Sequence, residues 1–255
     1  MFKKCNAYQI KLFMAFLMVL DHLPHIPGLV PSPWEGIFHA LTRCVAVWFA
    51  YMAVEGFLHT RNRLRYNARL FLWAGVMAAG NFLLNRLFSG AGVEIHNNIF
   101  LTLALGELML NVLFTPMPCD PDRTQRQLAG WFVLRMAGAA GAAALAVCFG
   151  EGAHVVLPFM LITYVFRGRV RTRNLLCLAY GALLLWMAYI PYPTAAETVD
   201  MLLFNCDGLF ITVLPFLALY NGERGPQTKF SKYFFYGFYP AHLWIITIIA
   251  YFVAR

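Results

Sequence analysis

Residues 8–24 read YQIKLFMAFLMVLDHLP, an almost unbroken apolar run with one cation near its start and an Asp-His pair near its end. A helix of this length extends about 25 Å, which approaches the roughly 30 Å hydrocarbon core of a bilayer. Lys3 and Lys4 precede the run, and Pro24 and Pro27 follow it in place of a small-residue cleavage site. We therefore expect a retained first transmembrane helix and not a cleaved signal peptide.

Similar apolar runs recur along the whole chain of 255 residues, which is 60% hydrophobic and 13% charged and has a mean hydropathy of +0.61. Soluble domains carry roughly 25% charged residues. The sequence predicts an all-α, polytopic transmembrane helical bundle of about nine spans (eight to ten), built as a single domain over residues 1–255. The expected spans are 8–24, 35–58, 68–88, 98–115, 129–149, 153–166, 174–192, 200–220 and 233–253. The segment 150–170 is short for a span, and a re-entrant loop is the alternative there.

Basic residues gather on alternate connections between these runs, and this asymmetry predicts the orientation. With a cytoplasmic N-terminus, the cytoplasmic loops hold almost all of the cations, as the positive-inside rule requires. An odd number of spans then leaves the C-terminus outside. Because the cations form short clusters and not one basic face, the net charge of +8 indicates topology, and no nucleic-acid partner is expected. The cytoplasmic cations are Arg61, Arg63, Arg65, Arg69, Arg123, Arg126, Arg167, Arg169, Arg171, Arg173, Arg224, Lys229 and Lys232, against Arg86 and Arg255 outside.

The cysteines are scattered and are interpreted as packing residues. They form no Cys-x-x-Cys pair, and no paired histidine spacing accompanies them, so neither a zinc site nor a disulfide framework is predicted. No metal is expected. The residues are Cys5, Cys44, Cys119, Cys148, Cys177 and Cys206.

Ionisable side chains inside the expected spans are functional candidates, because a charge near the bilayer centre costs a few kcal/mol even on mild scales. Lys11 and His22 lie eleven positions apart (22 − 11), which places them on nearly the same helix face about 16 Å apart. This geometry suits a ligand with an anionic head and a deeper reactive end, such as coenzyme A; a hydrogen-bonded packing histidine is the alternative. The remaining candidates are Asp21, Arg43, Glu55, Glu107, Arg135, Asp207 and His242.

A purely structural role is also open for the buried charges. Arg43 or Arg135 would then pair with Glu107 or Asp207 and lock helices together, as intramembrane charges usually do.

Four short patches in a fixed order carry a family resemblance: FLMVLDH at 16–22, EGFLHTR at 55–61 followed by Tyr66 and Arg69, NIF at 98–100, and YNG at 220–222 followed by YPAHL at 239–243. The spacing of Lys11 and His22 resembles that of acyltransferase-3 type membrane acyltransferases. The patches together resemble the TraX family, whose namesake is a pilin N-terminal acetylase of conjugative plasmids. Where that family commonly has Gly-Arg before a Phe-Pro step, this chain has TRC at 42–44 and VWF at 47–49, so its acceptor stays open.

The resemblance implies that His22 is catalytic, and its chemistry suits a general base that takes a proton from the attacking acceptor. Asp21 points about 100° away on the helix, so an acid of another span, such as Glu107 or Asp207, is the expected orienting partner. Arg43 or His242 is expected to stabilise the developing oxyanion. The predicted catalytic set is therefore His22, Asp21, Arg43 and His242.

The cations Lys11, Arg61 and Arg69 are the candidates for binding the cofactor phosphates, since guanidinium groups bind phosphate bidentately. The alternative is that Arg61 and Arg69 only determine the topology and bind no ligand. Glu55 is expected to support this set by pairing with Lys11 or Arg61.

The expected protein is thus an acetyltransferase of the bacterial inner membrane. It would move an acetyl group from acetyl-CoA to an amine or hydroxyl of a peptide, a pilin-like protein or a glycan. A small transporter and a non-enzymatic assembly factor are the alternatives. The sequence shows no matching pair of glycine- or proline-broken short helices that would favour a transporter.

Overall fold

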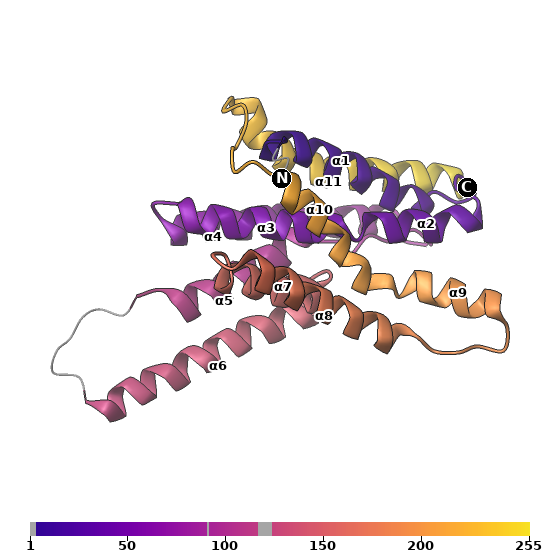
Figure 1. The fold of residues 1–255 in the computed structure, drawn as a ribbon. Coiled ribbons are helices and arrows are strands. Elements are labelled where there is room, and N and C mark those ends of the chain that lie inside the picture. Colours follow the sequence, from indigo (N-terminus) through magenta and orange to yellow (C-terminus); the bar gives the residue numbers. More distant parts are fainter. Residues whose placement is uncertain (1–3, 91, 117–123) are drawn as a thin grey trace.

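The computed structural model describes residues 4–90, 92–116 and 124–255, and its regular elements are helices apart from one isolated bridge between Cys5 and Tyr220 (Figure 1). The all-α class is confirmed, whereas Lys3, Cys119 and Arg123 fall outside the described residues. The elements are α1 Ala7–His22, η1 Leu23–His25, α2 Ser32–Thr42, α3 Cys44–His59, α4 Arg63–Leu87, α5 Ile99–Phe114, α6 Gln125–Phe149, α7 Ala153–Val165, α8 Val170–Ala188, α9 Ala195–Phe204, η2 Cys206–Thr212, α10 Val213–Leu219 and α11 Lys229–Val253.

Every predicted span falls mainly on helix, but fewer helices than predicted are long and apolar enough to cross a bilayer. Within the described residues, four segments qualify: Trp34–His59, Arg63–Leu87, Gln125–Phe149 and Tyr233–Val253. The bent pair Ala195–Phe204 and Cys206–Leu219 raises the number to five. The prediction of about nine full-length spans is therefore not confirmed, while a polytopic membrane protein is supported.

The shortfall arises because several apolar runs form helices that end early. Helices α1 and α5 have 16 residues each and α7 has 13, so they reach only about 20 to 24 Å. Helix α7 begins after Gly152, which has a left-handed φ of 59°, and an arginine-rich segment follows its end. Hydropathy detects these apolar stretches but does not locate such ends.

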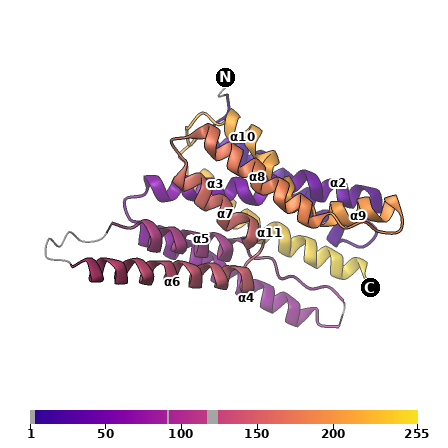
Figure 2. The same ribbon diagram turned by 60° about the horizontal axis from the view of Figure 1, so that its bottom comes forward.

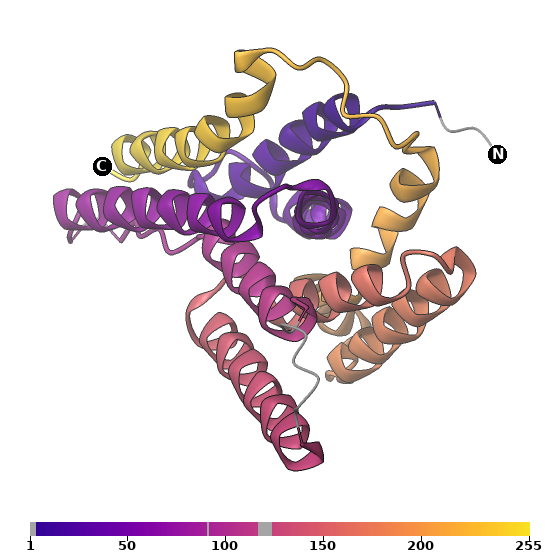
Figure 3. The same cartoon turned by 90° about the vertical axis from the view of Figure 1, so that its left-hand side faces the viewer.

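Helix α3 occupies the centre of the bundle (Figure 3). It continues α2 after a single break at Arg43, and the two together form one of the candidate spans. Helices α1, α5 and α7 and the segment η2 pack around it. Its side chains Val47, Trp48 and Phe57 are fully buried. Helix α3 is therefore a core element of the bundle. Its side chains that line the cavity start from this packed backbone.

Helix α6 lies at the edge of the molecule, alongside α5 (Figure 2). Its large apolar side chains Phe132, Val133, Leu134 and Phe149 are exposed. Exposed apolar surface of this extent on a 25-residue helix is expected to face lipid. The helix therefore borders the bilayer and takes no part in the central cavity described below.

The start of the chain is tied to the segment that precedes α11. The backbone N–H of Ala7 donates to the carbonyl of Glu223 at 2.8 Å, and that of Asn221 donates to the carbonyl of Cys5 at 3.0 Å. Asn6 then begins α1 with a capping box that it shares with Gln9. These bonds fix the N-terminal end of α1 against residues 219–223.

Helix α8 crosses η2 through two facing glycines, and this contact provides a test of the packing. A Cβ at Gly208 would meet the carbonyl oxygen of Gly181 and lie 3.0 Å from the backbone nitrogen of Leu185. Because backbone atoms cannot turn aside, we expect Gly208→Ala to destabilise the protein by about 1–3 kcal/mol. Thermal unfolding in detergent measures this loss.

The matched control is Gly75→Ala in α4, where a Cβ would meet nothing within 4 Å. Alanine is the better helix former by about 1 kcal/mol, so Gly75→Ala should unfold at the wild-type temperature or above it. Equal melting of the Gly208 and Gly75 variants would contradict the close crossing.

Candidate functional site

A central cavity of about 1080 Å³ runs along α1 and is walled by α3, α4, α5 and α11 together with the segments 151–154 and 220–229. It brings together the predicted catalytic and cofactor-binding residues except His242, whose ring lies against that of His22. The predicted residues that line it are Lys11, Asp21, His22, Arg43, Glu55, Arg61 and Arg69.

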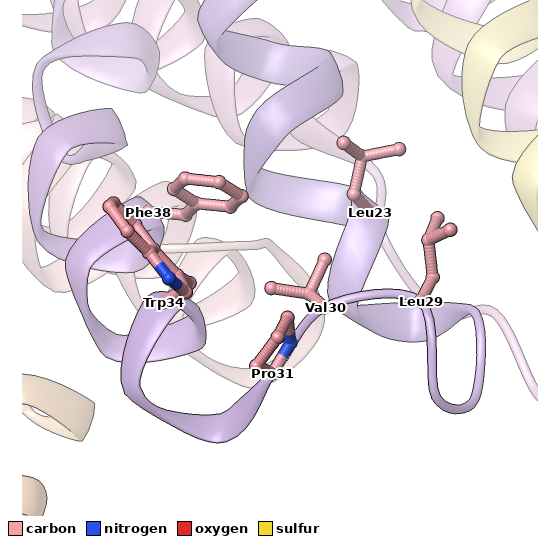
Figure 4. A pocket seen from close by; sticks show the side chains of 6 residues that line it. All are labelled: Leu23, Leu29, Val30, Pro31, Trp34 and Phe38. Atoms are coloured by element: carbon pink, nitrogen blue, oxygen red, sulfur yellow. The ribbon is translucent and has the colours of Figure 1, made fainter.

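A second, smaller pocket of about 520 Å³ lies between η1 and α2 (Figure 4). Its lining provides no acid, base or nucleophile, so it carries no chemistry of its own. The lining residues are Leu23, Leu29, Val30, Pro31, Trp34 and Phe38.

His22 is the last residue of α1 and is buried at one end of the central cavity. Its Nδ1 lies 2.7 Å from the carbonyl oxygen of Met18, one turn back on the same helix. A carbonyl only accepts, so Nδ1 carries the proton in the neutral ring and Nε2 keeps a free lone pair. The backbone therefore orients the imidazole, and within the described residues neither Glu107 nor Asp207 forms a hydrogen bond with it.

His242 lies edge-on to His22, with ring centroids 5.3 Å apart. Its Nδ1 lies 3.0 Å from the carbonyl oxygen of Phe238, and the ring stacks on that of Phe238 at 5.2 Å. Its Nε2 is buried and has no hydrogen-bond partner among the described residues. By the same argument, Nε2 of a neutral His242 is an acceptor. Only a protonated His242 ring could therefore donate a hydrogen bond from Nε2 to an oxyanion.

Arg43 joins two carboxylates at the break between α2 and α3. One guanidinium nitrogen lies 3.2 Å from Asp21, and the other lies 3.2 Å from Asp207 in η2. Thr42 donates a hydrogen bond of 2.6 Å to Asp21, and Nε2 of His154 lies 2.9 Å from Asp207. The predicted structural pairing of Arg43 with Asp207 is confirmed, and Asp21 belongs to this network.

Two other predicted pairings are wrong. Arg135 donates to the backbone carbonyls of Leu113 and Thr115, at the end of α5, and so satisfies the last turn of that helix in place of an acid. Glu55 pairs with His59 one turn later, at 3.8 Å, and not with Lys11 or Arg61. For Glu55 the partner is local, because a neighbouring turn lies within reach of a long side chain, whereas Arg135 reaches the backbone of another helix.

Glu107 in α5 is fully buried, and neither carboxylate oxygen has a hydrogen-bond partner within the described part of the chain. It does not line the central cavity. Its predicted roles, as a partner of Arg43 or Arg135 or as the orienting acid of His22, find no hydrogen bond or ion pair to support them among the described residues.

Cations surround the opposite end of the cavity. Lys11 lies over the ring of Phe235 at 5.6 Å, and Arg69 lies over that of Tyr66 at 5.2 Å. Arg61 and Arg224 join them in the lining. The cavity therefore has a cationic end and a histidine end, separated by most of the length of α1.

Sequence reasoning missed several residues of this wall, among them Glu151, His154, Tyr239 and Arg224. Tyr239 belongs to the YPAHL patch, and Arg224 was read as a topological cation. Glu151 and His154 lie close to Gly152, at the start of the shortest predicted span. An ionisable residue beside an apolar stretch is the signal that could have identified them as site residues.

Comparison with known proteins gives one match. No curated protein and no solved structure matches the chain. The family model described as TraX protein matches residues 7–250, a range that contains every residue of the central cavity. The resemblance carried by the four sequence patches is thereby confirmed, and the chain belongs to the TraX family.

Proposed function

We propose that this protein is a membrane-embedded acetyltransferase that moves the acetyl group of acetyl-CoA to an amine or hydroxyl of a peptide, pilin-like or glycan acceptor. The TraX family is associated with N-terminal acetylation of pilin, an acetyltransferase activity. The observation that carries the proposal is the single cavity that joins the cationic end, with Lys11, to His22. Helix content supports a multi-pass membrane protein, and we infer the bacterial inner membrane.

The cavity suits the two ends of acetyl-CoA. Lys11, Arg61 and Arg69 would hold the phosphates, because charge-assisted hydrogen bonds to phosphate are strong and cytosolic cofactor approaches from this side. Lys11 and His22 belong to one uninterrupted helix, so their separation of about 16 Å follows from the helical rise. The pantetheine arm would extend between them and bring the thioester to His22. Glu55, paired with His59, would support this end without touching phosphate.

The proposed reaction needs one base at the histidine end. As the acceptor attacks the thioester carbonyl, its proton passes to Nε2 of His22, and a carbon–nitrogen or carbon–oxygen bond forms. The carbon–sulfur bond then breaks, and the imidazolium gives the proton to the departing thiolate. Arg43 and Asp21 would keep the end of α1 and the start of α3 in register, and His242 would pack the base in position.

One structural feature favours the alternative function of a transporter. The pair α9 and η2–α10 is bent by 59°, a broken helix that the sequence analysis did not expect. However, the residue at this bend, Asp207, is paired with Arg43 and His154 and is not free to bind an ion. Together with the family, this favours the enzyme over the transporter and over the assembly factor.

The direct test is binding and turnover of acetyl-CoA by detergent-purified protein, with free thiol as the product that is measured. Lys11→Gln should raise the Kd for acetyl-CoA on the order of tenfold, because it removes one charge-assisted contact to phosphate. Arg86→Gln, an exposed cation at the far end of α4, is the matched control and should bind as the wild type does. Folded wild-type protein that binds no acetyl-CoA would overturn the proposal.

A further inference from the structure

Glu151 differs from Asp21 and Asp207, two other carboxylates of the cavity wall, in having no ion pair with an arginine among the described residues. Its Oε2 accepts a hydrogen bond of 2.9 Å from the hydroxyl of Tyr239, and its Oε1 accepts one of 2.9 Å from the amide of Asn97. Both donors are neutral. In the part of the chain that the structure describes, no lysine or arginine forms an ion pair with Glu151, whereas Arg43 compensates both Asp21 and Asp207.

The surroundings hold this carboxylate in one place. Thr102 donates a hydrogen bond of 2.9 Å to the Glu151 backbone carbonyl, and the Tyr239 hydroxyl accepts one of 3.1 Å from the N–H of Ile99. Ile99 and Ala153 begin α5 and α7, so two helix N-termini point toward this region. Helix N-termini favour negative charge, which lets a carboxylate persist here without a cation of its own. The group is therefore preorganised and has no lysine or arginine as its partner among the described residues.

Glu151 also lies at the histidine end of the cavity. Tyr239 donates a hydrogen bond to Glu151, and its ring centroid lies 5.6 Å from that of His242. The ring centroid of His242 in turn lies 5.3 Å from that of His22. Both Glu151 and His22 line the same cavity. A ligand that reaches the imidazole thus meets a carboxylate in the adjoining wall.

We propose that Glu151 binds the ammonium group of the acceptor, so that the site selects a primary amine such as a peptide N-terminus over a hydroxyl. The inference rests on the proposed acetyl transfer and assigns its acceptor specificity to one residue. A carboxylate in a partly buried site gains most from a ligand that supplies the missing positive charge. A hydroxyl acceptor supplies none.

The proton balance of this assignment closes without a further reactant. The ammonium held by Glu151 gives one proton to Nε2 of His22, which passes it to water, so that a neutral amine faces a neutral imidazole. As the carbon–nitrogen bond forms, the second proton passes from nitrogen to Nε2. The imidazolium then gives that proton to the sulfur of coenzyme A as the carbon–sulfur bond breaks.

The test compares Glu151→Gln with wild type on two acceptors: a short peptide with a free α-amine, and its counterpart with an α-hydroxyl. Removing one charged hydrogen-bond partner is expected to raise the KM for the amine peptide by roughly ten- to a hundredfold, with a smaller effect on the hydroxyl peptide. The control is Glu94→Gln, an exposed glutamate outside the cavity, which should keep the wild-type KM. Binding of acetyl-CoA to each variant reports that it has folded.

A second measurement needs only the wild-type protein. A peptide with an N,N-dimethylated terminus keeps its positive charge and one N–H but forms no stable amide, so it should compete with the amine peptide, whereas an N-acetylated peptide should not. Wild-type KM in Glu151→Gln, or no competition by the dimethylated peptide, would overturn the assignment. Wild-type protein that fails to bind acetyl-CoA would instead overturn the proposed function, so the two failures are distinguishable.

Discussion

Replacement of His22 by alanine is expected to lower the kcat for acetyl transfer by roughly a hundredfold to ten-thousandfold while acetyl-CoA still binds. The reason is positional: Nδ1 is held by the Met18 carbonyl, which leaves Nε2 as the free base at the end of the cavity. The cations proposed to hold the cofactor lie at the other end of α1, so binding should survive the change. Thiol release and equilibrium binding, measured on the same preparation, separate the two effects.

The matched control for this experiment is His96→Ala, which removes an exposed imidazole outside the cavity. Added imidazole provides a sharper check, because the space vacated in His22→Ala can admit a free base and restore part of the rate. A purely structural role for His22 would show as lost folding without rescue. Turnover of His22→Ala at the wild-type rate would remove His22 from the chemistry.

The second large effect is expected at Arg43, whose replacement by methionine should destabilise the protein by about 2 kcal/mol. Breaking a buried ion pair by removing one partner costs roughly 3–5 kcal/mol, and partial exposure lowers this figure. The side chains of Arg43 and Asp21 are each 21% exposed and that of Asp207 is 35% exposed. The loss arises because two carboxylates then share one region without a cation. Thermal or denaturant unfolding in detergent measures it.

A double substitution distinguishes the ion pair from simple loss of packing. Asp207→Asn in the Arg43→Met background removes one of the stranded charges and should recover part of the stability. Arg86→Met, which removes an exposed arginine, should unfold as the wild type does. If the double variant were less stable than Arg43→Met by the full effect of Asp207→Asn alone, the two side chains would not interact.

Patterns within one helix were predictable from the sequence, because they depend only on the helical repeat. Lys11 and His22 do line one cavity from a single helix, and the span at 233–253 coincides with the apolar part of α11. The pairing of Arg43 with Asp207 was also anticipated, since intramembrane charges need partners. The number of full-length spans was not predictable in this way, because helix ends are set by local backbone geometry, as at Gly152.

Most contacts of Glu151 join distant parts of the chain, and the sequence pattern did not predict them. Glu151 meets Asn97 and Tyr239, which lie 54 and 88 positions away, and no local period links them. The orienting contact of His22 was missed for a different reason. A side-chain acid was expected, whereas the helix's own carbonyl at Met18 fills that role.

The bonds that tie the start of the chain to residues 219–223 have a consequence for biosynthesis. At about 5–20 residues per second, a ribosome finishes α1 many seconds before it makes Arg224 and the helix that follows. Throughout that interval the cationic mouth of the cavity lacks the wall that those residues and α11 provide. A nascent or truncated chain would hold Lys11 and His22 but no enclosed binding site. The proposed turnover of acetyl-CoA would therefore require a completely inserted protein.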